Sequence, residues 1–268
     1  MKLGYSTLGC PGWTLERAVG AAREYGYEGI ELRLLDDQVI SPALLAENRD
    51  RIRRAFGGDV ALAALGSSVR LSDPTPDAKR AQEADCVALI QEAKALGAPV
   101  IRVFGGKRPE GVTVEQGIKA VAESLNRLAP AAEDAGVKLV LETHDDFASA
   151  RTVADALARV SSPAVGALWD THHPYRMGES AREVWGLLSG RLLHTHVKDA
   201  RKHGDGWDLV LLGEGEVPVK EAVQTLVRND WQGYLVVEWE KKWHMEIEEP
   251  EVALPQHIRL LRQYMAEA

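Results

Sequence analysis

Three carboxylic acids and one histidine stand at the ends of apolar segments that are as long as strands. Glu142 ends the run Val-Lys-Leu-Val-Leu-Glu, and Asp170 ends Val-Gly-Ala-Leu-Trp-Asp. His196 ends Leu-Leu-His-Thr-His, and Glu238 ends Tyr-Leu-Val-Val-Glu. Brought together, these groups would repel one another and be costly to desolvate unless a cation lay between them. The pattern therefore predicts an enzyme that binds one divalent metal ion per chain. Oxygen-rich ligation with one imidazole favours Mn²⁺, with Mg²⁺, Co²⁺ or Zn²⁺ as alternatives.

Eight strand-like segments alternate with stretches in which apolar residues recur every three or four positions, as in amphipathic helices. The predicted strands are Lys2–Ser6, Gly29–Arg33, Val60–Leu65, Val100–Phe104, Lys138–Glu142, Val165–Asp170, Leu192–Val197 and Tyr234–Glu238. The clearest helical stretches are Thr14–Tyr25, Pro42–Phe56, Asp77–Leu96, Thr113–Ala135 and Glu221–Asn229, and a last helix follows Pro250. Strict alternation implies parallel strands joined by right-handed crossovers. We therefore predict an α/β protein with a (β/α)₈ TIM barrel fold in a single domain, residues 1–268, whose chemistry lies at the carboxyl ends of the strands.

The composition is that of a globular chain, since 45% of its 268 residues are hydrophobic and 27% are charged. A formal net charge of −8 argues against nucleic acid as a partner, because nucleic-acid binding needs a basic face. Cys10 and Cys86 are too few for a disulfide framework, and no apolar stretch is long enough for a secretory signal or a membrane span. Glycine-rich signatures of dinucleotide and P-loop sites are also absent. We expect a cytoplasmic protein that acts on a small molecule.

The predicted strand ends lie within five longer runs of residues. These are Leu141-Glu142-Thr143-His144, Trp169-Asp170-Thr171-His172-His173, His194-Thr195-His196-Val197-Lys198-Asp199, Leu212-Gly213-Glu214-Gly215-Glu216 and Val237-Glu238-Trp239-Glu240. The runs resemble the sugar phosphate isomerase/epimerase group of the xylose-isomerase-like TIM barrels, and the spacing agrees from Leu3 to the last helix. The resemblance implies that Glu142, Asp170, His196 and Glu238 are the metal ligands. It also implies that Glu142 and Glu238 are the acid/base pair and that His173 contacts substrate hydroxyls.

The resemblance favours an isomerase or epimerase of a sugar, keto-sugar or cyclitol that works through a metal-stabilised enediolate. An inosose-type dehydratase would use the same residues, and a barrel that binds sugar without turnover is a further alternative. An endonuclease IV-like role is disfavoured, because the extra histidines that it needs are absent at Gly66-Ser67-Ser68 and Gly105-Gly106. No glycine-rich turn for a phosphate follows the last two strands, so we expect an unphosphorylated substrate.

Two further side chains on the strand-5 and strand-7 faces are candidates for substrate binding. His144 shares a face with Glu142 and could donate to a substrate oxygen or cap a loop. Lys198 could hold an anionic substrate or carry a proton, or could form a salt bridge with Asp199 or Glu214.

Residues of the second strand and of nearby loops complete the predicted pocket. Arg33 points inward beside Glu31 and is predicted to bind substrate, whereas Arg102 is expected to pair with an inner carboxylate such as Glu31. Trp13 is predicted to stack on a sugar ring. Trp169 and His194 are expected in the core, although His194 could instead support a ligand. The segment Trp239–Glu249 is long for a loop of this fold and could cover the site or form the contact of a homodimer.

Overall fold

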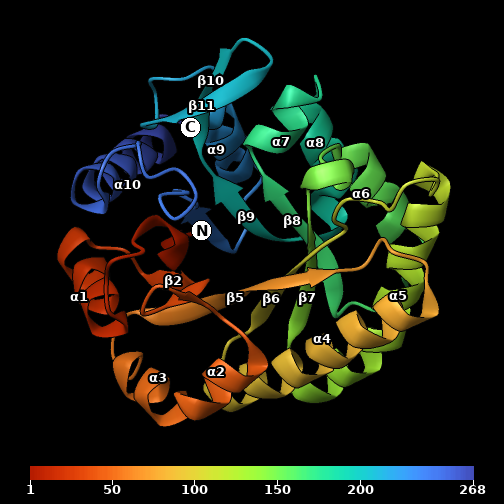
Figure 1. Cartoon of the computed structure of the whole chain (residues 1–268). Helices are drawn as coiled ribbons and strands as arrows, with labels where there is room; N and C mark the ends of the chain where they lie inside the picture. Colours follow the sequence, from red (N-terminus) through yellow and green to blue (C-terminus); the bar gives the residue numbers. More distant parts are fainter.

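Eight parallel strands close into a barrel in the computed structural model, which describes residues 1–268 (Figure 1). The barrel strands are β1 (Lys2–Ser6), β2 (Gly29–Leu32), β5 (Ala61–Arg70), β6 (Val100–Phe104), β7 (Lys138–Glu142), β8 (Val165–Asp170), β9 (Leu192–Val197) and β12 (Tyr234–Val237). Their order around the barrel is β1, β12, β9, β8, β7, β6, β5 and β2, so each strand lies beside its neighbours in the chain. The predicted (β/α)₈ TIM barrel is confirmed.

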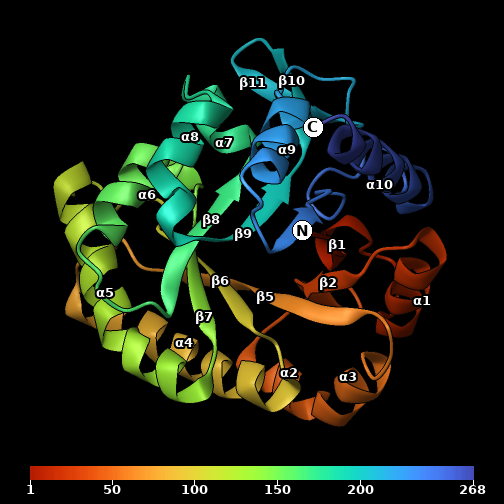
Figure 2. The ribbon, with the colours of Figure 1, turned by 180° about the vertical axis from the view of Figure 1, so that it is seen from behind.

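The helices form a ring outside the barrel, as the two opposite views show (Figures 1 and 2). They are α1 (Leu15–Tyr25), α2 (Pro42–Glu47), α3 (Arg49–Ala55), α4 (Pro76–Leu96), α5 (Val114–Ala135), α6 (Ala150–Leu157), α7 (His172–Arg176), α8 (Ala181–Leu188), α9 (Val219–Arg228) and α10 (Pro250–Ala266). Thr113 and Gln116 form a capping box at the start of α5, which satisfies two of the backbone groups that a helix start exposes. None of the helices combines the length and the apolar composition that a membrane span requires.

Three features of the fold differ from the prediction. The helix expected over 42–56 is divided at Asn48, whose side chain donates to the Leu44 carbonyl. The third barrel strand does not end at Leu65 but continues to Arg70. Two antiparallel hairpins were not expected: β3 (Leu34–Leu35) with β4 (Gln38–Val39), and β10 (Asp199–His203) with β11 (Gly206–Val210).

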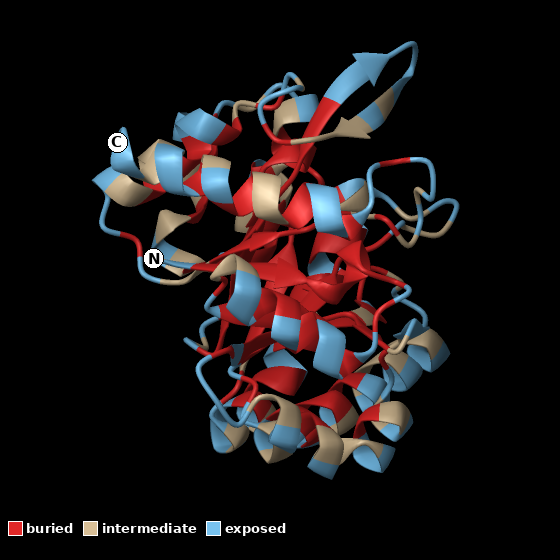
Figure 3. Ribbon diagram, turned by 90° about the vertical axis from the view of Figure 1, so that its left-hand side faces the viewer, coloured by how far each residue is buried: buried red, intermediate tan, exposed pale blue.

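The hydrophobic core fills the barrel and the space between the barrel and its helices (Figure 3). Trp169 lies in this core with 2% of its surface exposed, as predicted. Most of the β10–β11 hairpin is exposed or half-buried and projects from the body (Figure 3). The rigid packing below the strand ends is what can hold polar side chains in fixed positions above it.

Gly166 in β8 is required by close packing of the barrel wall. A Cβ atom at this position would lie 2.4 Å from the Arg191 carbonyl oxygen and 2.5 Å from a Leu193 methyl carbon. We expect Gly166→Ala to lower the free energy of unfolding by about 1 to 3 kcal/mol, because backbone must shift to admit the methyl group. Gly186 lies exposed within α8 with open space around it. Gly186→Ala is the matched control and should raise the same quantity by about 1 kcal/mol. Urea unfolding curves measure both, and equal stability of the Gly166 variant and the parent protein would contradict the packing argument.

Candidate functional site

Four polar side chains meet at the carboxyl ends of four adjacent strands. Glu142 ends β7, Asp170 ends β8, His196 lies in β9 and Glu238 directly follows β12. The strands place them at one level, since Asp170 lies opposite His196 in the β8–β9 register and Val237 lies opposite Val197 in the next pair. One nitrogen or oxygen atom from each residue lies within 4.8 Å of the others, and all four are buried. The predicted convergence is therefore present, whereas the role of each residue stays a prediction.

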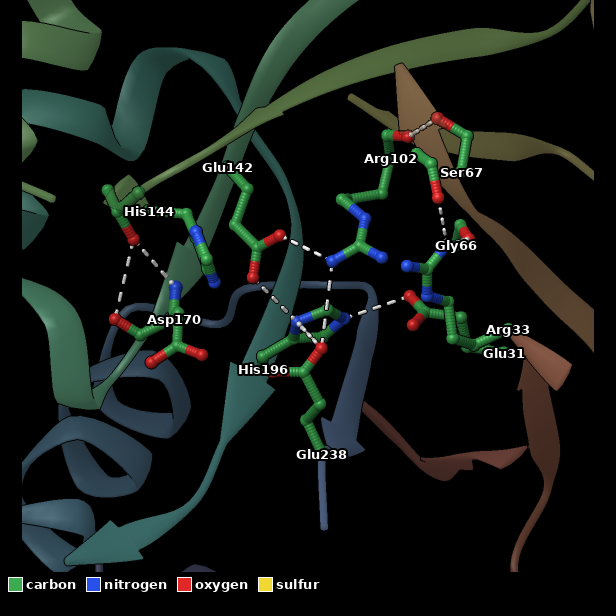
Figure 4. A network of polar contacts seen from close by, with 12 residues as sticks. Glu31, Arg33, Gly66, Ser67, Arg102, Glu142, His144, Asp170, His196 and Glu238 are labelled. Atoms are coloured by element: carbon green, nitrogen blue, oxygen red, sulfur yellow. Dashed lines mark hydrogen bonds and ion pairs between the residues drawn. The ribbon is translucent and has the colours of Figure 1, made fainter. Parts of the chain in front are cut away.

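Two cations neutralise part of the negative charge in this group. Arg102 Nη1 lies 2.7 Å from Glu142 Oε2 and 3.6 Å from Glu238 Oε1 (Figure 4). Lys198 Nζ lies 2.9 Å from Asp170 Oδ2 and 2.5 Å from Glu238 Oε2. Burial works to raise the pKa of Glu142, but Arg102 and His196 hold that pKa down at about 2. Burial raises the pKa of Asp170 to about 6, because Lys198 offsets the desolvation only in part.

The donor set suits a hard divalent cation. It comprises three carboxylates and one imidazole, and Asp170 Oδ2 is buried without accepting a hydrogen bond, although it contacts Lys198 as an ion pair. Carboxylate oxygens and an imidazole nitrogen are ligands that such a cation accepts. These residues therefore fit a bound divalent ion.

Glu31 of β2 supports His196 from the opposite side of the barrel. Its Oε2 lies 2.8 Å from His196 Nε2 and 3.2 Å from His194 Nε2, which leaves His196 Nδ1 facing Glu142 at 3.0 Å (Figure 4). A carboxylate that accepts from one ring nitrogen sets the tautomer and leaves the other nitrogen free to bind a metal. Arg102 pairs with an inner carboxylate, as expected, but its partner is Glu142 rather than Glu31.

His173 and His144 lie together beside this group. The two rings are 4.5 Å apart, and both nitrogens of the buried His173 ring lack a hydrogen-bond partner. His144 Nδ1 lies 3.2 Å from Asp145 Oδ2, and the His144 ring packs 4.7 Å from Phe104. The unpartnered His173 nitrogens are free to contact a ligand.

Lys198 points into the site rather than toward either of the salt-bridge partners considered from the sequence. Besides Asp170 and Glu238, its Nζ lies 2.5 Å from Glu240 Oε1. Asp199 instead accepts backbone N–H groups, among them that of Gly213 at 2.9 Å. Lys198 therefore links Asp170 and Glu238 to the loop that carries Glu240.

A cavity of about 230 Å³ opens beside Glu238. The side chains that line it include Arg33, Arg102, Phe104, His144, Glu240 and Trp243. Trp13 is not among the lining residues; it is 7% exposed, packs in the core and carries the Arg17 guanidinium 4.5 Å above its ring. Stacking of Trp13 on a sugar stays a prediction, and Trp243 is the tryptophan that borders the cavity.

The segment Trp239–Glu249 covers one edge of this cavity through Trp243. It is closed on itself, because Trp239 Nε1 donates to the Glu248 carbonyl and Lys241 Nζ donates to the carbonyls of Met245 and Ile247. The position agrees with the predicted cover of the site, while its movement and a homodimer contact stay predictions.

Residues 19–264 match the family described as Xylose isomerase-like TIM barrel, and the chain belongs to that family. A fructoselysine 3-epimerase from Escherichia coli O157:H7 is 27% identical over 257 residues, which cover 89% of this chain and 90% of that protein. An inosose dehydratase from Clostridium perfringens is 29% identical over 156 residues, which cover 52% of each chain. Among solved structures, the IOLI protein with a bound zinc atom has the same fold, with a TM-score of 0.85, 18% identity and coverage of 100% of this chain and 99% of that chain.

Removal and return of a divalent metal should change the stability of the protein. We expect Mn²⁺ at about 100 times its dissociation constant to raise the free energy of unfolding of EDTA-treated protein by ~2.7 kcal/mol, since the ion binds only the folded state. Asp170→Asn should abolish most of this gain, whereas Asp134→Asn on the exposed end of α5 should keep it. Thermal unfolding with and without Mn²⁺ measures the effect, and an unchanged melting temperature of the parent protein would refute metal binding.

The contact of Glu31 with His196 should strengthen metal binding. We expect Glu31→Gln to weaken Mn²⁺ binding about 10- to 100-fold, because the histidine loses the charged partner that orients it. Isothermal titration calorimetry measures the dissociation constant, and circular dichroism checks that the variant is folded. A variant that binds Mn²⁺ as tightly as the parent would show that Glu31 has no part in orienting the ligand.

Proposed function

We propose that the chain is a divalent-metal-dependent epimerase or isomerase of a keto-sugar or a related polyhydroxy ketone. The observation that carries this proposal is the buried meeting of Glu142, Asp170, His196 and Glu238 at the edge of a polar cavity. The likeness to a fructoselysine 3-epimerase over nine-tenths of both chains supports it. One ion per chain is proposed, Mn²⁺ first, with Mg²⁺, Co²⁺ or Zn²⁺ as alternatives that the oxygen-rich donor set also accepts.

The four ligand residues would hold the ion, which when bound polarises a substrate carbonyl and stabilises the negative charge of an enediolate. Glu142 and Glu238 stand on β7 and just after β12, with a strand pair between them in the barrel order. In the proposed reaction one of these carboxylates removes the proton from the carbon next to the carbonyl, and the other returns a proton to the opposite face. Arg102 contacts both carboxylates, offsets their mutual repulsion and so fixes their arrangement.

Three other residues would position the substrate or the glutamate that acts on it. His173 has two ring nitrogens without partners, so one can donate to a substrate hydroxyl and the other can accept from one. Lys198 holds the carboxylates of Asp170 and Glu238, which keeps Glu238 oriented at the cavity. His144 lines the same cavity and is proposed as a further contact to a substrate oxygen.

A dehydratase of a keto-cyclitol is the second candidate. The match to an inosose dehydratase over about half of each chain favours it as the alternative. The first step would be the same removal of a proton beside a carbonyl, after which a C–O bond breaks and water leaves. NMR of the products separates the two reactions, because an epimerase retains every oxygen and a dehydratase loses one.

The two glutamates can be tested by proton exchange. In deuterated water the Mn²⁺-loaded protein should incorporate deuterium next to the carbonyl of its ketose substrate. Glu142→Gln and Glu238→Gln should each lower kcat by about 10²- to 10⁴-fold, since each removes one proton-transfer group. Glu110→Gln, a change at an exposed position outside the site, should keep the parent rate. A panel of ketoses and inosose analysed by NMR measures the exchange. If no member exchanges with the metal-loaded parent protein, the proposed reaction is wrong.

A further inference from the structure

Three arginines lie on the side of the barrel mouth that also carries Glu31. Arg33 directly follows β2, Arg70 ends β5 and Arg102 lies in β6. These three strands are neighbours in the barrel, and the strands that carry the carboxylates and His196 follow them in the order β7, β8, β9 and β12. In Figure 4, Arg33 and Arg102 lie on the opposite side of the network from Asp170.

Only one of these three arginines has its charge balanced by a carboxylate within the chain. Arg102 pairs with Glu142 at 2.7 Å, whereas neither Arg33 nor Arg70 has a carboxylate oxygen within 4.0 Å. Arg33 Nη1 donates to the Gly66 carbonyl at 3.0 Å and to Ser68 Oγ at 2.8 Å, and its Nε and Nη2 make no hydrogen bond with the protein. This arginine is 7% exposed, and burial together with Arg102 lowers its pKa to about 10, although the carboxylates of Glu238, Glu31 and Glu142 oppose the shift. A buried guanidinium without a carboxylate in direct contact is costly, so its free N–H donors at a cavity point to an anion supplied by a ligand.

Arg70 is held at the same cavity by its surroundings. Its guanidinium carbon lies 5.8 Å from the centre of the Phe104 ring. Its stem lies against Gly106, where a Cβ atom would be only 3.0 Å from Arg70 Cβ, and Gly106 also has the left-handed φ of +86°. The nearby acid Asp145 is engaged by His144 at 3.2 Å. Arg33 and Arg70 therefore both line the cavity without a carboxylate in direct contact, although Glu238 and Glu240 line it as well.

We propose that the substrate is a small polyhydroxy ketone that carries one anionic group, a carboxylate or a phosphate ester, bound by Arg33 and Arg70. Its ketone end then faces Glu142 and Glu238, because the cavity that the arginines line also reaches Glu238. Guanidinium groups bind both kinds of anion through paired N–H donors, so side chains can replace the glycine-rich turn that the sequence lacks. This inference rests on the proposed function and narrows its substrate class.

Three ligands with one carbon skeleton test the inference: fructose, fructuronate and fructose 6-phosphate. Affinities are measured by calorimetry with the Mg²⁺-loaded protein at low ionic strength. We expect at least one anionic ligand to bind 10-fold or more tightly than fructose, and the tighter of the two identifies the anion. Arg33→Gln and Arg70→Gln should each lower this preference at least fivefold. Arg80→Gln is the matched control, because Arg80 lies on the exposed face of α4, and it should keep the preference.

Equal affinity for the three ligands, no binding of any of them, or an undiminished preference in the Arg70 variant would each overturn the inference. Arg70 is exposed, so its variant is decisive if the Arg33 variant does not fold. Deuterium exchange on the wider ketose panel keeps the two proposals separate. Deuterium exchange without a preference for anionic ligands would support the epimerase proposal and overturn the anion-binding inference. A preference for anionic ligands without exchange would support the anion-binding site and overturn the proposed reaction.

Discussion

The burial of several like charges at one point is the constraint on which the rest of the site depends. Three carboxylates lie within a few ångströms of one another in the barrel mouth, away from water. Such a group is tolerable only when cations approach it from more than one side. Arg102 does so from β6 and Lys198 from the end of β9. The three carboxylates and the imidazole are also groups that could bind a metal ion. The ion pairs around the carboxylates are explained by this need to offset buried negative charge.

The barrel is suited to this task because its closed sheet sets the level and the spacing of the strand ends. Asp170 and His196 face each other through strand register, and close packing at Gly166 holds β8 against β9 below them. Strand register alone does not fix the orientation of a side chain. Contacts across the barrel do so, as when Glu31 contacts the ring of His196. Barrel closure and cross-barrel hydrogen bonds together hold the four polar side chains in a pre-organised group.

The sequence was sufficient for the barrel and for the four converging polar side chains, because each lies at the end of an apolar strand and parallel strands end at one face. It was insufficient for partners across the barrel. Glu31 and Arg102 both point inward, and only the closed structure shows that one meets His196 and the other Glu142. Arg70 was missed because β5 was expected to stop five residues earlier.

The hairpins were missed although a local signal was present. The β3–β4 turn uses Asp36 and Asp37 with φ of 48° and 69°, and the β10–β11 turn contains Gly204 with φ of 57°. Aspartate and glycine at such positions are typical of two-residue hairpin turns. The opposite halves of the barrel mouth also come from different parts of the chain, since the three arginines lie before residue 105 and the proposed acid/base pair after residue 140. In the proposed site, the residues that would choose the substrate can therefore change in evolution separately from those that would transfer protons, and exchange of the first half-barrel between relatives would change the substrate preference while keeping the reaction.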